Sequence, residues 1–192
     1  MKRKVILILG CLLVLAGLAL ALVSQMVGKQ DAVKARERAM QLLSRIPKTT
    51  RGLPHTRQNT VMPVLQLDGV DHVAVLEVPM FDVVLPVVNG WDRSMLRRQP
   101  CRYYGSAYDN TLVIGGSDGE GQLAFVSRID VGMQVLVTDM TGVQFAYRVR
   151  VVERSSQADA DTLCTEEGLT LFARNSYGLE YVIVRCTPVS GG

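Results

Sequence analysis

The residues best suited to nucleophilic chemistry in this chain are its cysteines and histidines. Cys101, Cys164 and Cys186 lie outside the apolar N-terminal segment, and the histidines are His55 and His72. A thiolate beside an imidazole is a common arrangement for transfer through a covalent intermediate. No cysteine here neighbours a histidine in sequence, and none stands in a Cys-x-x-Cys pair, so the spacing indicates neither a zinc site nor a disulfide framework. The sequence predicts no metal and no cofactor, and leaves a single disulfide open.

Each of these residues also has an ordinary structural interpretation. Cys186 falls on an expected strand, where a cysteine packs as a small hydrophobic residue. Cys164 lies in the polar run 155–167, whose carboxylates raise the pKa of a nearby thiol and weaken it as a nucleophile. We expect His55 to be a solvated loop residue and His72, at the head of a strand, to be solvated or bonded locally. No catalytic pair is therefore favoured by the residues alone.

The N-terminal segment is apolar enough to cross a membrane. After Lys2, Arg3 and Lys4, residues 5–23 contain no charged or strongly polar side chain, and at about 1.5 Å per residue they give roughly 28 Å of helix. We expect a single-pass cell-membrane anchor over 5–23, with residues 1–4 as a cytoplasmic tail and the C-terminal domain on the extracytoplasmic face. Basic residues flank both ends of the segment and do not decide its orientation. We place the tail in the cytoplasm because a basic tail of only four residues is seldom translocated. A cleaved signal peptide ending near residues 19–21 is the alternative.

The rest of the chain is expected to form a stalk, a linker and one domain. Residues 31–46 mix apolar and charged side chains and stop at Pro47, which predicts a short stalk helix near the membrane or against the domain, with a partner-binding helix as the alternative. Turn-forming residues over 47–59 predict a linker, so 24–59 is stalk helix and linker and 60–192 is the domain. The net charge of +3 comes largely from the anchor flanks, and no basic and aromatic patch suggests nucleic-acid binding.

From residue 61 onward, short β-branched runs alternate with turn signals, a pattern typical of a barrel or sandwich. The clearest hairpin joins 134–138 to 143–149, where apolar and polar side chains alternate as on a strand with one buried face. Strands are expected at 72–78, 83–88, 111–115, 133–139, 143–153, 169–174 and 181–187.

Several sequence blocks in this region follow one another at a characteristic spacing. They include Val75-Leu76-Glu77-Val78-Pro79, Asn110-Thr111-Leu112-Val113-Ile114-Gly115-Gly116 and Gly168-Leu169-Thr170-Leu171-Phe172, with others at 85–87, 100–106, 129–135 and 181–185. Together they cover about 70–187 and resemble the sortase family, the membrane-anchored cysteine transpeptidases of Gram-positive bacteria. The resemblance implies a mainly β fold, an eight-stranded β-barrel preceded by the transmembrane helix and the short stalk helix. It also implies recognition of a sorting motif of the Leu-Pro-x-Thr-Gly kind.

The residues that such an activity needs differ in this chain. In active members a cysteine thiolate attacks the Thr-Gly bond, a histidine protonates the leaving amine, and an arginine stabilises the oxyanion or positions the peptide. Ser117 stands at the histidine position and Arg174 at the cysteine position, while the arginine position aligns with Tyr181, or with Glu180 if the loop shifts the register. A guanidinium offers no nucleophile, and losing one member of such a unit already removes most of its activity.

We therefore interpret the chain as an inactive pseudo-sortase that binds or scaffolds partners in cell-surface protein sorting or pilus assembly. The expected partners are a sorting-signal peptide, a pilin or an active sortase. Ser117, Asp118, Arg174 and Tyr181 are expected to line the remaining peptide cleft, where Arg174 either binds a carboxylate or forms an ion pair with Asp118 or Glu180. The alternatives are an active cysteine transpeptidase or hydrolase with relocated catalytic residues, and a purely structural membrane component.

Overall fold

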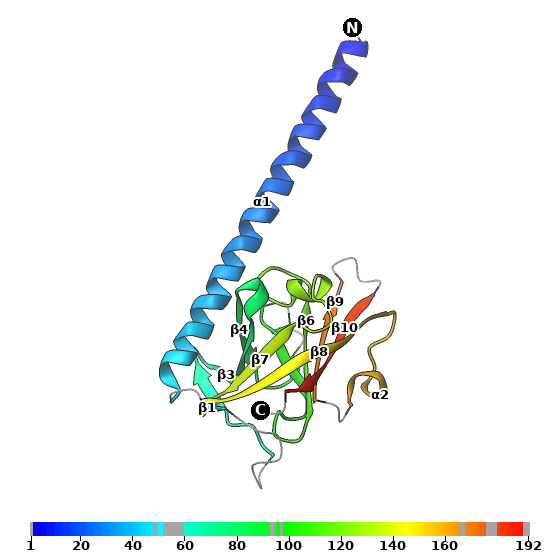
Figure 1. The fold of residues 1–192 in the computed structure, drawn as a ribbon. Coiled ribbons are helices and arrows are strands. Elements are labelled where there is room, and N and C mark those ends of the chain that lie inside the picture. The colour runs from blue at the N-terminus through cyan, green and yellow to red at the C-terminus, as the bar shows by residue number, and fades with distance from the viewer. Residues whose placement is uncertain are drawn as a thin grey trace.

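A computed structural model describes residues 2–47, 50–51, 60–92, 95–96, 98–165, 168–175 and 180–189 of the chain. A single long helix, α1 (Lys2–Arg45), runs past the β domain and far beyond one end of it (Figure 1). Among the described residues it is the one helix long and apolar enough to cross a membrane, and its most apolar window is not buried within the protein. This is consistent with single-pass anchoring. His55 and most of the predicted linker lie outside the described residues.

The expected stalk helix is the C-terminal part of α1 and is not a separate element. The helix continues without a break from the apolar segment to Arg45, and the Ile46 N–H still bonds the Leu42 carbonyl oxygen at 3.2 Å. It ends just before Pro47, because the residue preceding a proline is disfavoured in helical conformation. No proline interrupts the chain before that point, and an established helix adds one hydrogen bond for each further residue.

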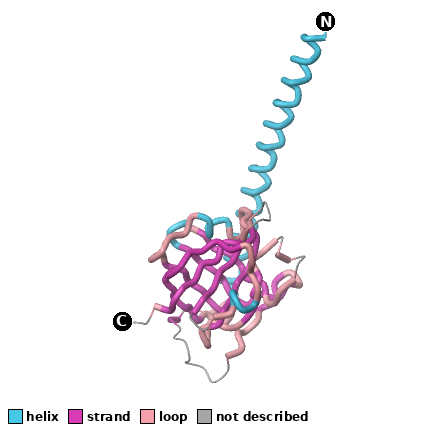
Figure 2. The backbone as a smooth tube through the Cα atoms, turned by 90° about the vertical axis from the view of Figure 1, so that its right-hand side faces the viewer, coloured by secondary structure: helices cyan, strands magenta, loops and turns pink. Residues whose placement is uncertain are grey.

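The β-strands form one sheet that closes on itself (Figure 2). The order β8-β10-β9-β6-β5-β4-β3 is completed by β7, which pairs with both β3 and β8, so these eight strands make a barrel. Their bounds, with those of two short marginal strands, are β1 (Thr50–Arg51), β2 (Leu65–Leu67), β3 (Val70–Val78), β4 (Val83–Val88), β5 (Cys101–Tyr104), β6 (Thr111–Ser117), β7 (Gln134–Asp139), β8 (Val143–Ser155), β9 (Gly168–Arg174) and β10 (Tyr181–Pro188). The short helices are η1 (Pro79–Phe81), η2 (Ala124–Ser127) and α2 (Ala160–Leu163). The predicted eight-stranded, mainly β barrel is confirmed.

The burial of the strands explains which part of the barrel can carry a site. On β8, Phe145, Tyr147 and Val149 are buried while Arg148 and Arg150 are exposed, as the alternation in the sequence predicts. On β9, by contrast, every residue from Gly168 to Ala173 is buried. A strand reads as one apolar run when both of its faces are covered. The outer face of β9 belongs to a second apolar cluster of Val113, Leu163, Phe172 and Ile183.

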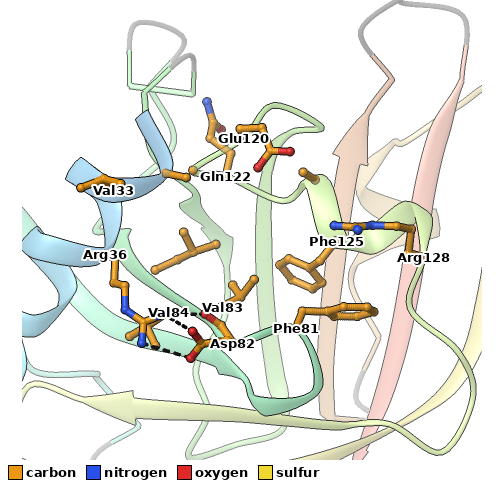
Figure 3. A pocket seen from close by; sticks show the side chains of 14 residues that line it. Val33, Arg36, Phe81, Asp82, Val83, Val84, Glu120, Gln122, Phe125 and Arg128 are labelled. Atoms are coloured by element: carbon orange, nitrogen blue, oxygen red, sulfur yellow. Dashed lines mark hydrogen bonds and ion pairs between the residues drawn. The ribbon is translucent and has the colours of Figure 1, made fainter. Parts of the chain in front are cut away.

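The stalk part of α1 packs against the barrel near β4 and β3. Ala35, Ala39 and Leu42 are buried there, and Ala39 and Leu42 share an apolar cluster with Leu67, Val75 and Met140. A fork of hydrogen bonds strengthens the contact, because Arg36 donates to both carboxylate oxygens of Asp82 at 2.8 and 3.0 Å (Figure 3). The guanidinium lowers the pKa of Asp82, first through this hydrogen bond and then through its charge. A cavity of about 270 Å³ remains between α1, η1 and η2.

The turn after β6 also touches α1. Gly121 has a φ of +77°, and a Cβ there would lie 2.6 Å from the backbone carbonyl of Asp31. A Cβ on Gly28 would lie 3.3 Å from Cγ of Glu120. Gly121 therefore lets the backbone of the turn approach that of the helix closely, and Gly28 leaves room for the Glu120 side chain.

Candidate functional site

Three adjacent strands bring Ser117, Arg174 and Tyr181 together. β6 and β9 are parallel with Ser117 opposite Arg174, and β10 returns antiparallel with Tyr181 opposite Arg174. The Asp118 N–H donates to the Arg174 carbonyl oxygen at 3.3 Å, which joins the turn after β6 to the end of β9. Tyr181, and not Glu180, occupies the position across from Arg174.

These residues border a cleft on the outer side of β6, β9 and β10. The cleft has a volume of about 570 Å³ and is lined by Trp91, Leu96, Tyr103, Gly116, Ser117, Ala158, Phe172, Arg174 and Tyr181. Asp118 follows Ser117 but is not part of this lining. Most of the lining is apolar or aromatic with a few polar groups at one end, which is the usual composition of a ligand site.

Trp91, Tyr103 and Phe172 form a cluster of aromatic rings that lines the cleft, called the aromatic wall below. The Trp91 ring stacks on Phe172 with centroids 5.4 Å apart and meets Tyr103 edge-on at 4.9 Å. Gly115 makes this packing possible, because a Cβ there would lie 2.3 Å from the Phe172 ring and 2.6 Å from the Trp91 ring. Stacked and edge-on pairs of this kind hold each ring in place, and Trp91 remains 41% exposed.

The polar end of the cleft contains a cation and a hydroxyl. Cζ of the exposed Arg174 lies 5.9 Å from the centroid of the Tyr181 ring, within the range of a cation–π contact. The Ser117 Oγ accepts from the Gly119 N–H at 3.4 Å, while its own N–H donates to Gln122 Oε1 at 3.1 Å. The hydroxyl is thus used within its own turn. An ion pair between Arg174 and Asp118 or Glu180 stays a prediction.

His72 and Cys101 lie near each other, but in the interior. The His72 Nε2 is 3.1 Å from Oε1 of Gln99, and the Cys101 Sγ donates to the Gln99 carbonyl oxygen at 3.5 Å. Both side chains are buried, and burial raises the pKa of Cys101 to about 11. The thiol is therefore protonated at neutral pH, and neither residue lines the cleft.

The other two cysteines of the β domain are also outside the cleft. Burial raises the pKa of Cys186 to about 12. The pKa of the half-buried Cys164 is raised first by desolvation and then by the charge of Asp161, so its predicted direction is right but the larger cause is burial. All four cysteines of the chain lie in the described residues, and all are free thiols.

This burial predicts the order in which the thiols react. We expect iodoacetamide at pH 8 to alkylate Cys164 in the folded protein, while Cys101 and Cys186 stay unmodified until denaturant is added. The reason is that the thiolate is the nucleophile and folding favours the neutral thiol at both buried positions. Peptide mass spectrometry measures the modification. Alkylation of Cys101 as fast as Cys164 under native conditions would contradict the assignment.

Several residues of the cleft have no counterpart in the sequence-based prediction. Trp91, Leu96 and Tyr103 come from the segment between β4 and β6, and Ala158 precedes α2. Trp91 is the sole tryptophan of the chain and follows a Gly at position 90, which was the one available signal. Nothing local in the sequence brings it onto Gly115.

Comparison with known proteins identifies the architecture. No protein-family profile and no curated protein matches the chain. Sortase A from Corynebacterium diphtheriae has a similar structure, with a TM-score of 0.56, 17% sequence identity, and coverage of 87% of this chain and 86% of that chain. The sortase D5 transpeptidase of Clostridium perfringens is similar with a TM-score of 0.55 and 16% sequence identity, over 86% of this chain and 99% of that chain. Sortase C1 of Streptococcus suis is similar with a TM-score of 0.56 and 16% sequence identity, over 63% of this chain and 74% of that chain.

At sequence identities this low, structural similarity shows a shared fold but does not show a shared chemical activity. The agreement with sortase A and with the sortase D5 transpeptidase nevertheless covers 86–87% of this chain and most of each of those proteins. The chain has the sortase fold.

Proposed function

We propose that this protein is a membrane-anchored, catalytically inactive pseudo-sortase whose cleft binds a peptide carboxylate. The observation that supports this most directly is Arg174, which stands at the end of β9 between Ser117 and Tyr181, at the polar end of an aromatic cleft. A guanidinium presents a planar fork of donors that matches a carboxylate. It contributes nothing that attacks a carbonyl carbon.

The thiols weigh against turnover. Acyl transfer needs a thiolate in the same cleft as the peptide, with an acid close enough to protonate the leaving amine. Cys101 and Cys186 are buried with raised pKa values, and Cys164 lies on the far side of Tyr103 beside Tyr104 and Asp161. An active transpeptidase or hydrolase with relocated residues would have to expose Cys101 or Cys186, or use Cys164, which does not line the cleft.

The aromatic wall suggests which part of a ligand would occupy the rest of the cleft. Leucine and proline side chains pack well on ring faces, and an extended peptide of the Leu-Pro-x-Thr kind would place its terminal carboxylate a few residues away from them. We infer that the partners are sorting-signal peptides, a pilin or an active sortase, met on the extracytoplasmic face of a Gram-positive cell membrane in protein sorting or pilus assembly.

Binding of a peptide carboxylate tests the proposal. We expect Leu-Pro-Glu-Thr with a free C-terminus to change the fluorescence of Trp91 in the full chain in detergent micelles, because this tryptophan lines the cleft. Arg174→Gln should weaken that binding by about 10-fold or more, as a charge-assisted hydrogen bond contributes about 1.5–3 kcal/mol. The same peptide with a C-terminal amide should bind both proteins equally weakly.

Arg150→Gln is the matched control, since it removes an exposed arginine from β8 without touching the cleft. If Arg174→Gln and Arg150→Gln bound the acid peptide equally well, the carboxylate role of Arg174 would be wrong. If no peptide bound at millimolar concentration, a purely structural membrane role would be favoured.

Turnover is tested separately. The full chain is incubated with a labelled Leu-Pro-x-Thr-Gly peptide and hydroxylamine, and we expect no peptide hydroxamate. A hydroxamate that disappears in Cys101→Ala, Cys164→Ala or Cys186→Ala would show that a relocated thiol is active and would overturn the inactive assignment.

A further inference from the structure

We propose that the cleft end of the barrel rests on the membrane surface, where Lys34, Arg38 and Arg98 bind the phosphate of an anionic lipid head group. The inference rests on the membrane anchoring proposed above and is independent of peptide binding.

The first support is the rigid connection between the anchor and the barrel. α1 continues unbroken from the apolar segment to Arg45, and its stalk part is packed against the barrel through buried Ala39 and Leu42. The turn after β6 touches the same helix at Gly28 and Asp31. Ser117 begins this turn and Arg174 lies opposite it, so the polar end of the cleft is the end from which α1 runs on toward its N-terminus (Figure 1).

The second support is the position of this end of the barrel relative to the membrane. After the polar pair Ser24 and Gln25, α1 carries two more exposed apolar side chains, Met26 and Val27, which are 68% and 52% exposed, and the first charged residue after them is Lys29. At about 1.5 Å per residue, Asp31 and Lys34 lie roughly 6 and 10 Å beyond Val27, near the outer edge of a polar lipid layer about 5–7 Å thick. Helical side chains tilt toward the N-terminus, and long basic ones extend further, so Lys34 reaches back toward the lipid.

The third support is a cavity at this level whose three cations outnumber its two carboxylates. It has a volume of about 290 Å³ and is lined by Asp31, Lys34, Arg38, Arg98, Glu120 and Gln122. Within the part of the chain that the structure describes, the ion pairs are Arg36 with Asp82 and Arg185 with Glu153. Lys34, Arg38 and Arg98 therefore converge without ion-pair partners among these residues, an arrangement that attracts a phosphate.

The two carboxylates of the cavity limit the kind of head group. Asp31 and Glu120 would repel a second negative charge but can accept hydrogen bonds from hydroxyl groups. A phosphodiester with a hydroxylated head, such as phosphatidylglycerol, satisfies both sets of side chains. Zwitterionic phosphatidylcholine has no hydroxyl group to donate.

The cavity and the cleft are connected through one side chain. Gln122 lines the cavity, and its Oε1 accepts the N–H of Ser117 in the cleft at 3.1 Å. A lipid held in the cavity would thus fix the turn that forms one border of the cleft, and ligands would enter the cleft along the membrane.

Lipid retention tests the proposal. The full chain is reconstituted into vesicles with equal amounts of phosphatidylglycerol and phosphatidylcholine, extracted in mild detergent, and the lipids that remain bound are counted by mass spectrometry. We expect phosphatidylglycerol to be retained preferentially, and its excess to fall about fivefold for each cation removed in Arg38→Gln/Arg98→Gln. Arg45→Gln/Arg150→Gln removes the same charge elsewhere and should leave the preference unchanged.

A second variant separates a membrane surface site from a site for soluble phosphates. Seven alternating alanine and glutamine residues inserted between Val27 and Gly28, after the exposed apolar pair Met26 and Val27, keep the cavity but move it about 10 Å away from the bilayer. We expect this insertion to abolish the preference, and glycerol phosphate in solution to leave it intact in the wild type. Equal retention of the two lipids by the wild type, or an equal loss in the Arg45→Gln/Arg150→Gln control, would overturn the proposal. Release of the protein from vesicles by alkaline carbonate would instead contradict the anchoring.

Discussion

The triple variant Ser117→His/Arg174→Cys/Tyr181→Arg should give a cleft that forms an acyl-enzyme. Ser117 and Tyr181 both lie directly across from Arg174 in the sheet, so the three new side chains would start from neighbouring backbone positions. An imidazole and a guanidinium beside the thiol lower its pKa and supply the leaving-group proton and the oxyanion contact. With hydroxylamine and a Leu-Pro-x-Thr-Gly peptide, we expect hydroxamate at a rate roughly 10³-fold or more above the wild type.

The single variants are the controls for this experiment. Members of a catalytic unit act together, so Arg174→Cys alone should give little or no product. Ser117→His/Arg174→Ala/Tyr181→Arg should be silent as well, because it has the new histidine and arginine but no nucleophile at position 174. A triple variant that folds normally but makes no thioester with the peptide would mean that the cleft has lost the shape for acyl transfer, and not only the side chains.

The second large effect concerns Asp139, a carboxylate buried at the end of β7. It accepts hydrogen bonds from the Tyr108 hydroxyl, from the Thr141 N–H at 2.8 Å and from the Val143 N–H at 2.9 Å. Asp139→Ala removes the carboxylate that these donors share. The Tyr108 side chain is buried and Thr141 and Val143 are half-buried, and a buried group that loses its partner costs about 1–3 kcal/mol. We expect the free energy of unfolding to fall by about 3 kcal/mol or more, with a midpoint of thermal unfolding roughly 10 °C lower.

Circular dichroism of the full chain in detergent follows this unfolding, because the β signal of the barrel disappears in the transition. Asp139→Asn keeps an oxygen that can accept from the two N–H groups, so its free energy of unfolding should fall by less than that of Asp139→Ala. Asp130→Ala, at an exposed position, should change stability by no more than about 0.5 kcal/mol. A midpoint for Asp139→Ala equal to that of Asp130→Ala would mean that water replaces the lost carboxylate.

The sequence was informative wherever a strand has a strong periodic or apolar pattern. The expected 134–138 and 143–149 hairpin is present as β7 and β8, and 83–88 coincides with β4. On β8 one face packs on the core, so burial and sequence follow the same alternation over 145–150, whereas β4 is apolar throughout. The continuous apolar run of β9 was also predicted as a strand, although its burial on both faces depends on Trp91 and α2, which are distant in sequence.

Elements fixed by the tertiary fold were not found from the sequence. β5 has only four residues, follows Pro100, and contains an irregularity between Arg102 and Tyr104, so it has no clear alternation. The marginal strands β1 and β2 are shorter still. The stalk was expected as its own helix because polar residues follow residue 23, but local polarity does not end a helix that has no proline and gains packing further along.

The candidate site could be predicted only in part from the sequence, because some of its residues adjoin recognisable strands and others reach it through long-range packing. Ser117, Arg174 and Tyr181 were found because each adjoins a recognisable strand, and the pairing of those strands brings them together. The aromatic wall was missed because Trp91 and Tyr103 reach Phe172 only through long-range packing over Gly115. Asp118, placed in the cleft by its neighbour in sequence, lies just outside the lining.

The parallel pairing of β6 with β9 has a kinetic consequence. Ser117 and Arg174 become neighbours only after the whole segment between them, including the β7–β8 hairpin, has been enclosed. Non-local parallel pairs are slow to form, because loop-closure entropy is lost before the contacts compensate for it. The helix α1, made of local contacts, would be complete long before then, so nascent molecules would pass through a stage in which the helix is formed and an unfinished barrel exposes strand edges to its neighbours.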